Sequence, residues 1–160
     1  MLFGGSAARA SVQDETTGLT WHTDLTEAHK KSQETGLPIF GFFTGSDWCG
    51  WCIKLQRDVF VKQAFIDWAK TKVVLLELDF PRRTVQTAEL KKQNQELQQA
   101  FQVSGYPTVW LFRSKKDAET GHFSLTAIGK LGYPRGGEIG KEEVKFLAEA
   151  DAVLVNDKPQ

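Results

Sequence analysis

Two near-continuous apolar runs dominate the hydrophobic pattern of this chain. They are "LPIFGFF" at positions 37–43 and "VVLLELDF" at positions 73–80. Both runs have the length of a strand, and continuous apolarity is typical of strands that are covered on both faces of a sheet. The pattern therefore predicts two central buried strands, the second of which ends at Pro81.

Capping signals and helical spacing indicate helices around these strands. Asp24 with Glu27 three residues later forms a capping-box pattern, and Gly36, closely followed by a proline, is a stop signal. A helix of about ten residues is therefore expected before the first strand. After that strand the pattern changes to a helix that starts near Cys49, and a second short helical stretch follows at 61–70.

A glutamine-rich run at 86–102 also has helical spacing. Leu90, Leu97 and Phe101 fall on one stripe, with polar residues between them. The glutamines are expected to form the solvent-facing side of this helix.

The C-terminal part of the chain has the pattern of a hairpin followed by a helix. Two strand-like runs, "TVWLFRS" and "FSLTAIGKLGY", flank the polar turn "KKDAETGH". The last helix is expected over 141–154, with Val144, Leu147 and Ala148 on one side. With a predicted edge strand at 18–24, the order of elements predicts an α/β fold: a central mixed sheet with helices on both faces.

Length and charge narrow the class of protein. A chain of 160 residues is long enough for one hydrophobic core, so folding needs neither a metal nor a disulfide framework. The 20 basic and 20 acidic residues cancel, which argues against a nucleic-acid partner. No apolar run reaches the ~20 residues that a membrane span needs. We expect a monomer.

The domain is expected to span 18–155, between flexible segments at 1–17 and 156–160. The first segment lacks the apolar core of a secretory signal, yet Ala8–Ala10 has the small-x-small form of a cleavage site. Three interpretations follow for this N-terminal extension: the remnant of a signal, an expression scar, or a loose terminus.

The chemistry of the chain centres on "WCGWC", which contains its only two cysteines, Cys49 and Cys52. A C-x-x-C pair that follows a strand and opens a helix is typical of a dithiol redox site. A free thiol with a pKa of ~8.5 is only ~3% thiolate at pH 7, and a helix N-terminus can supply about 2 kcal/mol toward the anion. Cys49 is therefore the expected nucleophile, and Cys52, one turn deeper, the expected resolving thiol.

Two other interpretations of the cysteine pair stay open. The cysteines could be inert core residues, although the flanking "TGSD" is loop chemistry. A structural zinc needs four ligands, whereas His22, His29 and His122 are neither near Cys49 in sequence nor in a paired spacing. Copper(I) accepts two thiolates, so a copper carrier is an alternative. The redox interpretation requires no organic cofactor and no metal.

Two motifs together resemble the thioredoxin superfamily. "FFTGSDWCGWCIKL" is similar to its active-site segment, and "VSGYPTVWLF" is similar to its cis-proline loop. The resemblance covers roughly residues 18–155 and implies the thioredoxin fold. Within the superfamily, the chain most resembles small exported, disulfide-isomerase-like proteins of bacteria. This implies a periplasmic or otherwise exported location, with the cytoplasm as the alternative.

The resemblance also implies roles for individual residues. Pro107 is expected to be cis and to lie against the cysteine pair, and Tyr106 is expected to offer backbone groups to a bound peptide. Trp48 is expected to shield the site and contact partners, while Trp51 lies at its rim. Gly50 and Trp51, between the cysteines, are expected to set the redox poise and complete the substrate-binding residues.

The chain departs from thioredoxin beneath the cysteines. The buried carboxylate of thioredoxin is absent from "PIFGFF", and Leu75 stands where its lysine partner is expected. Glu77 or Asp79 could accept a proton through water, but a local structural role is favoured for both. Asp47, beside Trp48, is expected to disfavour a thiolate.

The sequence as a whole predicts a thiol:disulfide oxidoreductase, a reductase or isomerase more than a net oxidant. Its expected partners are protein or peptide thiols and disulfides, with an upstream electron donor or acceptor. A non-catalytic binder is the alternative: a copper(I) carrier, or a peptide-docking module whose dithiol is incidental.

Overall fold

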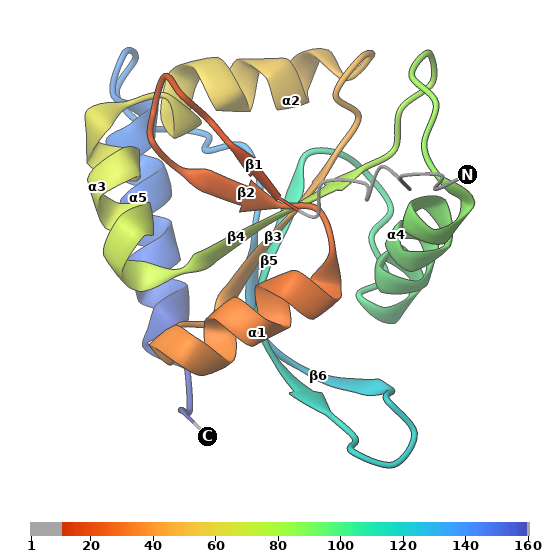
Figure 1. The fold of residues 1–160 in the computed structure, drawn as a ribbon. Helices are drawn as coiled ribbons and strands as arrows, with labels where there is room; N and C mark the ends of the chain where they lie inside the picture. Colours follow the sequence, from red (N-terminus) through yellow and green to blue (C-terminus); the bar gives the residue numbers. More distant parts are fainter. Residues whose placement is uncertain (1–10, 160) are drawn as a thin grey trace.

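The computed structural model describes residues 11–159 as one mixed sheet flanked by helices (Figure 1). The cleavage-site pattern at Ala8–Ala10 lies outside these residues. In chain order the elements are β1 (Ser11–Gln13), β2 (Thr20–His22), α1 (Leu25–Thr35), β3 (Ile39–Thr44), α2 (Gly50–Leu55), the π-helical turn η1 (Gln56–Phe60), α3 (Gln63–Lys72), β4 (Val74–Asp79), α4 (Ala88–Ala100), β5 (Thr108–Lys116), β6 (Phe123–Leu131) and α5 (Glu142–Leu154).

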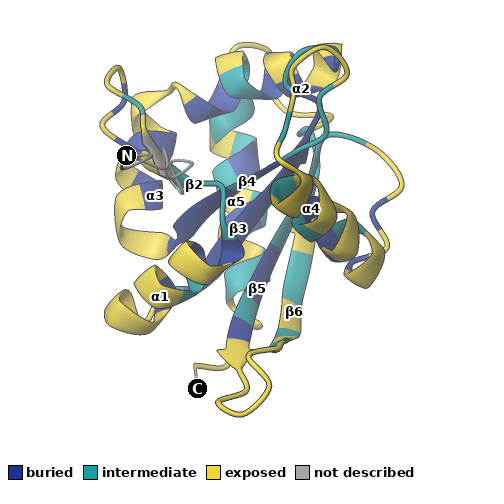
Figure 2. Cartoon of the chain, turned by 45° about the vertical axis from the view of Figure 1, so that its right-hand side comes forward, coloured by how far each residue is buried: buried dark blue, intermediate teal, exposed yellow. Residues whose placement is uncertain are grey.

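The two apolar runs form the centre of the sheet, as predicted. The strand order is β1-β2-β4-β3-β5-β6, with β3 and β4 parallel and β5 antiparallel to β3. Every residue of β3 is buried, because helices cover both faces (Figure 2). Side chains of α2, η1, α3 and α5 pack in one core cluster, and those of α1 and α4 in the other. The α/β prediction is confirmed.

The prediction that 18–24 forms the edge strand is wrong. β2 lies second in the sheet, because β1 pairs with it antiparallel, with Ser11 opposite His22 and Gln13 opposite Thr20. β1 falls within the 1–17 segment, and at the other end of the domain Asp157 forms an ion pair with Arg113 at 2.7 Å. Residues 11–13 before the predicted 18–155 domain and Asp157 after it therefore contact the folded unit.

Helix α1 has the predicted ends. The Asp24 side chain accepts hydrogen bonds from the backbone N–H groups of Thr26 and Glu27, at 2.7 and 3.4 Å. Gly36 ends the helix with φ +74°, a left-handed conformation that glycine adopts without steric cost.

The glutamines of the α4 region do not all face solvent, which corrects the prediction. Gln86 Nε2 donates to the Asp79 carbonyl at 3.0 Å, and Gln93 Nε2 donates to the Thr23 carbonyl at 3.0 Å. Gln98 Oε1 accepts a hydrogen bond from the Tyr106 hydroxyl at 2.6 Å. Gln93 and Gln98 fasten α4 to Thr23 and Tyr106, and Gln86 fastens the loop before α4 to the end of β4. Hydrophobic spacing alone does not reveal these contacts.

The buried stripe of α5 agrees with the prediction only in part: Leu147 packs against the core, but the other two predicted residues do not. Phe146 and Ala150 are fully buried, whereas Val144 is 57% exposed and Ala148 is exposed. The helix turns its aromatic residue inward, where Phe146 meets the rings of Phe40, Phe60 and Phe65. Among the described helices, none is long and apolar enough to cross a bilayer.

Candidate active site

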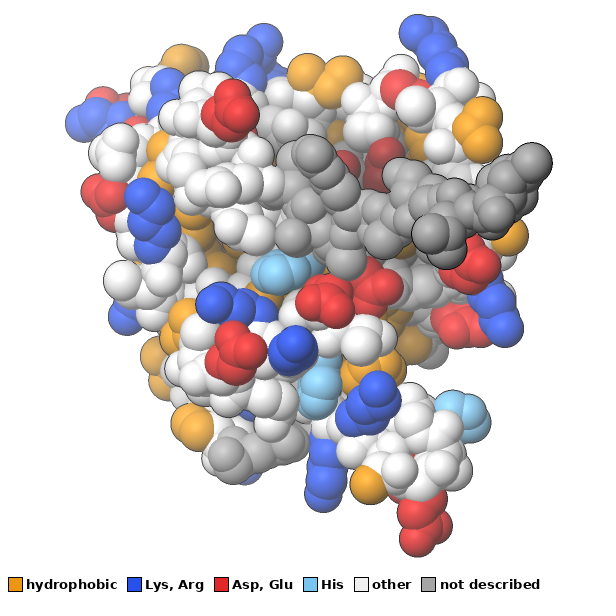
Figure 3. Space-filling model, in the orientation of Figure 1, with side chains coloured by type: hydrophobic (Ala, Val, Ile, Leu, Met, Phe, Trp, Pro, Cys, Tyr) orange, Lys and Arg blue, Asp and Glu red, His pale blue; other side chains and the backbone are white. Residues whose placement is uncertain are grey.

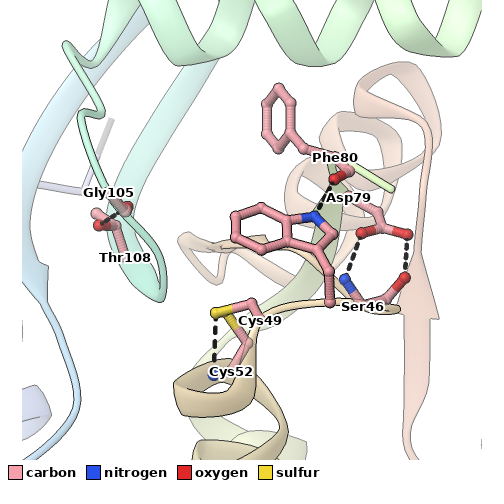
Figure 4. The surroundings of a disulfide bond; sticks show 8 residues. Ser46, Cys49, Cys52, Asp79, Phe80, Gly105 and Thr108 are labelled. Carbon is pink, nitrogen blue, oxygen red and sulfur yellow. Dashed lines mark hydrogen bonds between the residues drawn. A yellow bond between two sulfur atoms is a disulfide. The ribbon is translucent and has the colours of Figure 1, made fainter. Parts of the chain in front are cut away.

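The two cysteines lie at the start of α2, after the short loop that follows β3, at one end of the molecule (Figures 1 and 4). Cys49 is the N-cap of α2, and its Sγ accepts a hydrogen bond from the Cys52 backbone N–H at 3.2 Å. The two residues form a disulfide, with their Cα atoms 5.3 Å apart. Cys49 is 6% exposed and Cys52 is fully buried, so an incoming group reaches Cys49 first.

The loop before Cys49 is fastened to the end of β4. The Ser46 N–H and hydroxyl donate to the Asp79 carboxylate at 2.8 and 2.5 Å, and Trp48 Nε1 donates to the Phe80 carbonyl at 2.7 Å (Figure 4). Gly45 lies directly against the Trp48 ring, in space that a Cβ atom would fill. This anchoring fixes the position of Trp48 beside the cysteines.

Asp47 turns its carboxylate to a different loop. The carboxylate accepts hydrogen bonds from the backbone N–H groups of Arg82, Arg83 and Thr84 at 2.8–2.9 Å, and from the Thr84 hydroxyl at 2.9 Å. The Arg82 N–H, helped by the other donors, holds the Asp47 pKa well below its usual range. The negative charge is thus engaged by four donors, so it disfavours a Cys49 thiolate less than sequence proximity suggested. The loop also places the Arg82 guanidinium 3.6 Å from the Trp48 ring centroid.

The proline loop between Gly105 and Thr108, which contains Pro107, lies across the cysteines from Ser46 and Asp79 (Figure 4). The Tyr106–Pro107 peptide bond is cis, as the resemblance implied. The Tyr106 ring stacks on Phe80, with centroids 5.2 Å apart, and meets Trp48 edge-on at 5.8 Å. Trp48, Phe80 and Tyr106 therefore form one continuous aromatic wall beside Cys49.

A second wall, on the Trp51 side, was not predicted from the sequence. Trp51 is 53% exposed, and its ring meets Tyr133 edge-on at 5.1 Å. Tyr133 donates to the Asp58 carboxylate at 2.6 Å, and Lys54 bonds both groups, reaching Asp58 at 2.6 Å. Lys54 and Tyr133 hold the Asp58 pKa well below its usual range. Tyr133 lies 75 residues from Asp58 in sequence, so no local pattern signals this cluster.

A cavity of about 440 Å³ adjoins this second wall. Trp51, Tyr133, Arg135 and Ile139 contribute to its lining. The loop "PRGGEIG", which supplies two of these residues, was predicted only as a connection before the last helix.

The two candidate proton acceptors have different surroundings. Asp79 is bonded to Ser46, which confirms its local structural role. Glu77 lies two residues beyond Leu75 on β4, and its side chain therefore projects from the face that packs against Cys52. It lines a cavity of about 240 Å³ with Phe42 and Gln56. Burial, with a contribution from the Asp79 charge, raises the Glu77 pKa to about 7.

The described residues offer no set of ligands for the metal-binding alternative. Over 11–159, no group of three or more His, Cys, Asp or Glu side chains is placed to hold an ion. His29, one of the three histidines, shares a hydrogen bond of 2.7 Å with the Ser114 hydroxyl.

Comparison with known proteins agrees with this architecture. A family model described as "Thioredoxin-like domain" matches residues 25–124. A solved structure titled "DsbH Oxidoreductase" superposes with a TM-score of 0.68 and 29% identity, covering 97% of this chain and 95% of that one.

Two curated relatives come from Chlamydia pneumoniae. "Disulfide bond reductase DsbH" is 34% identical over 119 residues, which is 74% of this chain and 66% of the relative. "Thioredoxin-related protein DsbJ" is 29% identical over 145 residues, which is 91% of this chain and 40% of the relative. The chain thus spans less than two thirds of the length of either relative.

Proposed function

Because this chain belongs to the thioredoxin-like domain family, we propose that it is a thiol:disulfide oxidoreductase working through Cys49 and Cys52. The observation that carries the proposal is the asymmetry of the pair. Cys49 caps α2 and accepts the Cys52 N–H, while Cys52 is fully buried behind it. A donor aimed at sulfur stabilises a thiolate, which is the reactive form of cysteine.

In the reductive direction the proposed cycle has two exchanges. The Cys49 thiolate attacks one sulfur of a substrate disulfide, that bond breaks, and the second substrate sulfur leaves as a thiolate that takes up a proton. The Cys52 thiol then loses its proton and attacks Cys49 Sγ, which releases the first substrate sulfur and forms the Cys49–Cys52 disulfide. Two electrons pass to the substrate, and an external dithiol returns them to the protein.

Five residues are proposed to hold the substrate beside the cysteines. Trp48, Tyr106 and Pro107 supply the aromatic wall and the backbone edge of the proline loop. Gly50 and Trp51 lie at the start of α2, where Gly50 has open space in place of a side chain. The absence of a side chain there leaves room for an approaching chain next to Cys49.

The test of the function is trapping. Cys52→Ala leaves Cys49 without its resolving partner, so stable mixed disulfides with cell-extract proteins are expected on non-reducing gels. Cys49→Ala should trap none, and the wild-type protein should reduce insulin with dithiothreitol as donor. No adducts with Cys52→Ala and no insulin reduction would refute the proposal. Tight binding of one copper(I) without catalysis would favour the carrier alternative.

We further propose the reductase or isomerase direction and an exported location. The relative named a disulfide bond reductase supports the direction, and protein disulfides, the proposed substrates, persist mainly in oxidising compartments. Fractionation of cells that produce the full-length protein tests the location: recovery with a periplasmic marker is expected, and recovery with a cytoplasmic marker would contradict it.

A further inference from the structure

Three arginine side chains on the surface around the cysteine site have no carboxylate partner in ion-pair contact within the described residues. Arg82, Arg83 and Arg135 are exposed, and within residues 11–159 none of their guanidinium groups forms an ion pair. The whole chain has a formal net charge of zero, and Figure 3 shows acidic and basic side chains interspersed over one face. The arginines without an ion-pair partner on both sides of the site therefore do not reflect an excess of positive charge over the whole chain.

On the Trp48 side, the arginines are held in place by their backbone. Asp47 accepts the N–H groups of both Arg82 and Arg83, and Arg82 lies over the Trp48 ring at 3.6 Å. Asp47 is the acidic residue nearest in sequence to Cys49, and its carboxylate is already engaged by four donors. The guanidinium groups stay available to an outside anion.

On the Trp51 side, the acidic neighbours are also engaged. Asp58 is bonded to Lys54 and Tyr133, and Glu142 Oε1 accepts the Gly140 N–H at 3.1 Å. Arg135 lines the same cavity as Trp51. The apolar part of that cavity includes Ile139, which is 95% exposed.

We propose that these two arginine groups select the partner: an extended polypeptide whose reactive cysteine is flanked on both sides by acidic residues, with an apolar side chain toward Trp51. This inference rests on the proposed function and narrows its substrate class. Carboxylates suit guanidinium groups because of their charge and their bidentate geometry. Complementary charge at the edge of a site acts mainly on the rate of encounter, and salt weakens it.

The test compares two disulfide-linked peptides that differ only in the residues flanking the cysteine, Glu in one and Lys in the other. At low ionic strength we expect kcat/KM to be about tenfold higher for the acidic peptide, and the ratio to fall toward one in 0.5 M salt. The triple variant R82Q/R83Q/R135Q should bring the ratio near one at low salt. Lys30→Gln, on α1 at the other end of the molecule (Figure 1), is the control for loss of a distant positive charge and should keep the wild-type ratio.

Two further measurements separate failure of this inference from failure of the function. Reduction of hydroxyethyl disulfide, which is small and uncharged, reports the cysteine chemistry alone. If the wild-type protein reduces it but treats both peptides equally, the arginine inference is overturned and the function stands. If the wild-type protein does not reduce it, the proposed function is refuted.

Binding of cysteine-to-serine versions of the peptides, followed by tryptophan fluorescence, then still tests the arginines. Equal affinities overturn the inference, and tighter binding of the acidic peptide supports it.

Discussion

Glu77 places a carboxyl group on the face of the sheet that packs against Cys52, and its surroundings favour the neutral form. Its neighbours on that face are apolar, since Phe42 lies opposite it on β3 and Leu75 precedes it on β4. The nearby Asp79 charge adds to the cost of ionisation. A carboxyl group with a pKa near 7 can both take up and release a proton near neutral pH.

The raised pKa makes stability depend on pH. Between the ordinary value of 4.5 and the native value of about 7, the folded protein holds a proton that the unfolded chain has released. Stability therefore falls as pH rises through this window, and the loss persists above it. At pH 8 we expect Glu77→Gln to be more stable than the wild type by up to about 3 kcal/mol, with a difference near zero at pH 4.

Urea unfolding at pH 4, 6 and 8 measures this difference. Glu15→Gln, at an exposed position, is the control and should follow the wild-type curve. A Glu77→Gln effect that is the same at all three pH values would show that packing, and not ionisation, is responsible.

At the scale of the element, the 81–86 loop is held by a side chain from outside it. Three consecutive backbone N–H groups point to Asp47. Asp47→Ala removes these acceptors, so the loop should open more often, and local opening exposes the backbone to proteases. Trypsin should cleave after Arg82 and Arg83 about tenfold faster in the variant.

Limited proteolysis with mass-spectrometric identification of the fragments measures this rate. Asp117→Ala breaks a similar turn in the β5–β6 hairpin, where Asp117 accepts the N–H groups of Glu119 and Thr120. It should leave the rate at Arg82 and Arg83 unchanged. Equal cleavage rates in Asp47→Ala and the wild type would mean that other contacts hold the loop.

The corrected stripe of α5 makes a second prediction at this scale. Phe146→Ala removes a fully buried ring, so the free energy of unfolding should fall by about 3–5 kcal/mol. Val144→Ala changes a side chain that is 57% exposed and should cost under about 1 kcal/mol. Denaturant unfolding of the two variants measures both values. The reverse ranking would restore the stripe that the sequence predicted.

The elements that the sequence predicted well are those with local signals. Each α1 cap is signalled by residues within one helical turn, and each buried strand by an apolar run of six to eight residues. The α5 stripe was misassigned because Val144 and Phe146 both fit a helical apolar spacing, and only the tertiary fold selects the face. β1 was missed because it is only three residues long, too short to show an alternating pattern.

At the scale of the whole molecule, part of the site could be predicted from sequence motifs and part could not. Trp48 to Cys52 and Tyr106–Pro107 were found because both motifs are short and their separation matches a known family. The Tyr133 and Asp47 hydrogen bonds were not, since they join segments 35 to 79 residues apart. A contact at that range leaves no periodic pattern in either segment.

The redox state links the two cysteines to the stability of the entire fold. Reduction and unfolding form a thermodynamic cycle, so the energy by which the disulfide stabilises the native protein equals the energy by which folding protects the disulfide from reduction. Strong oxidants are proteins whose reduced form is the more stable one. The proposed reductase direction requires the opposite order here.

We therefore expect the oxidised protein to unfold at a higher urea concentration than the reduced protein, each 1.4 kcal/mol of difference corresponding to about 30 mV of redox potential. Unfolding is followed with and without dithiothreitol. A Cys49→Ser/Cys52→Ser variant is the control, because its curve should not respond to the reductant. If the reduced protein proves more stable, folding favours the dithiol, the protein draws electrons from its partners, and the direction proposed for the cycle is reversed while its chemistry stands.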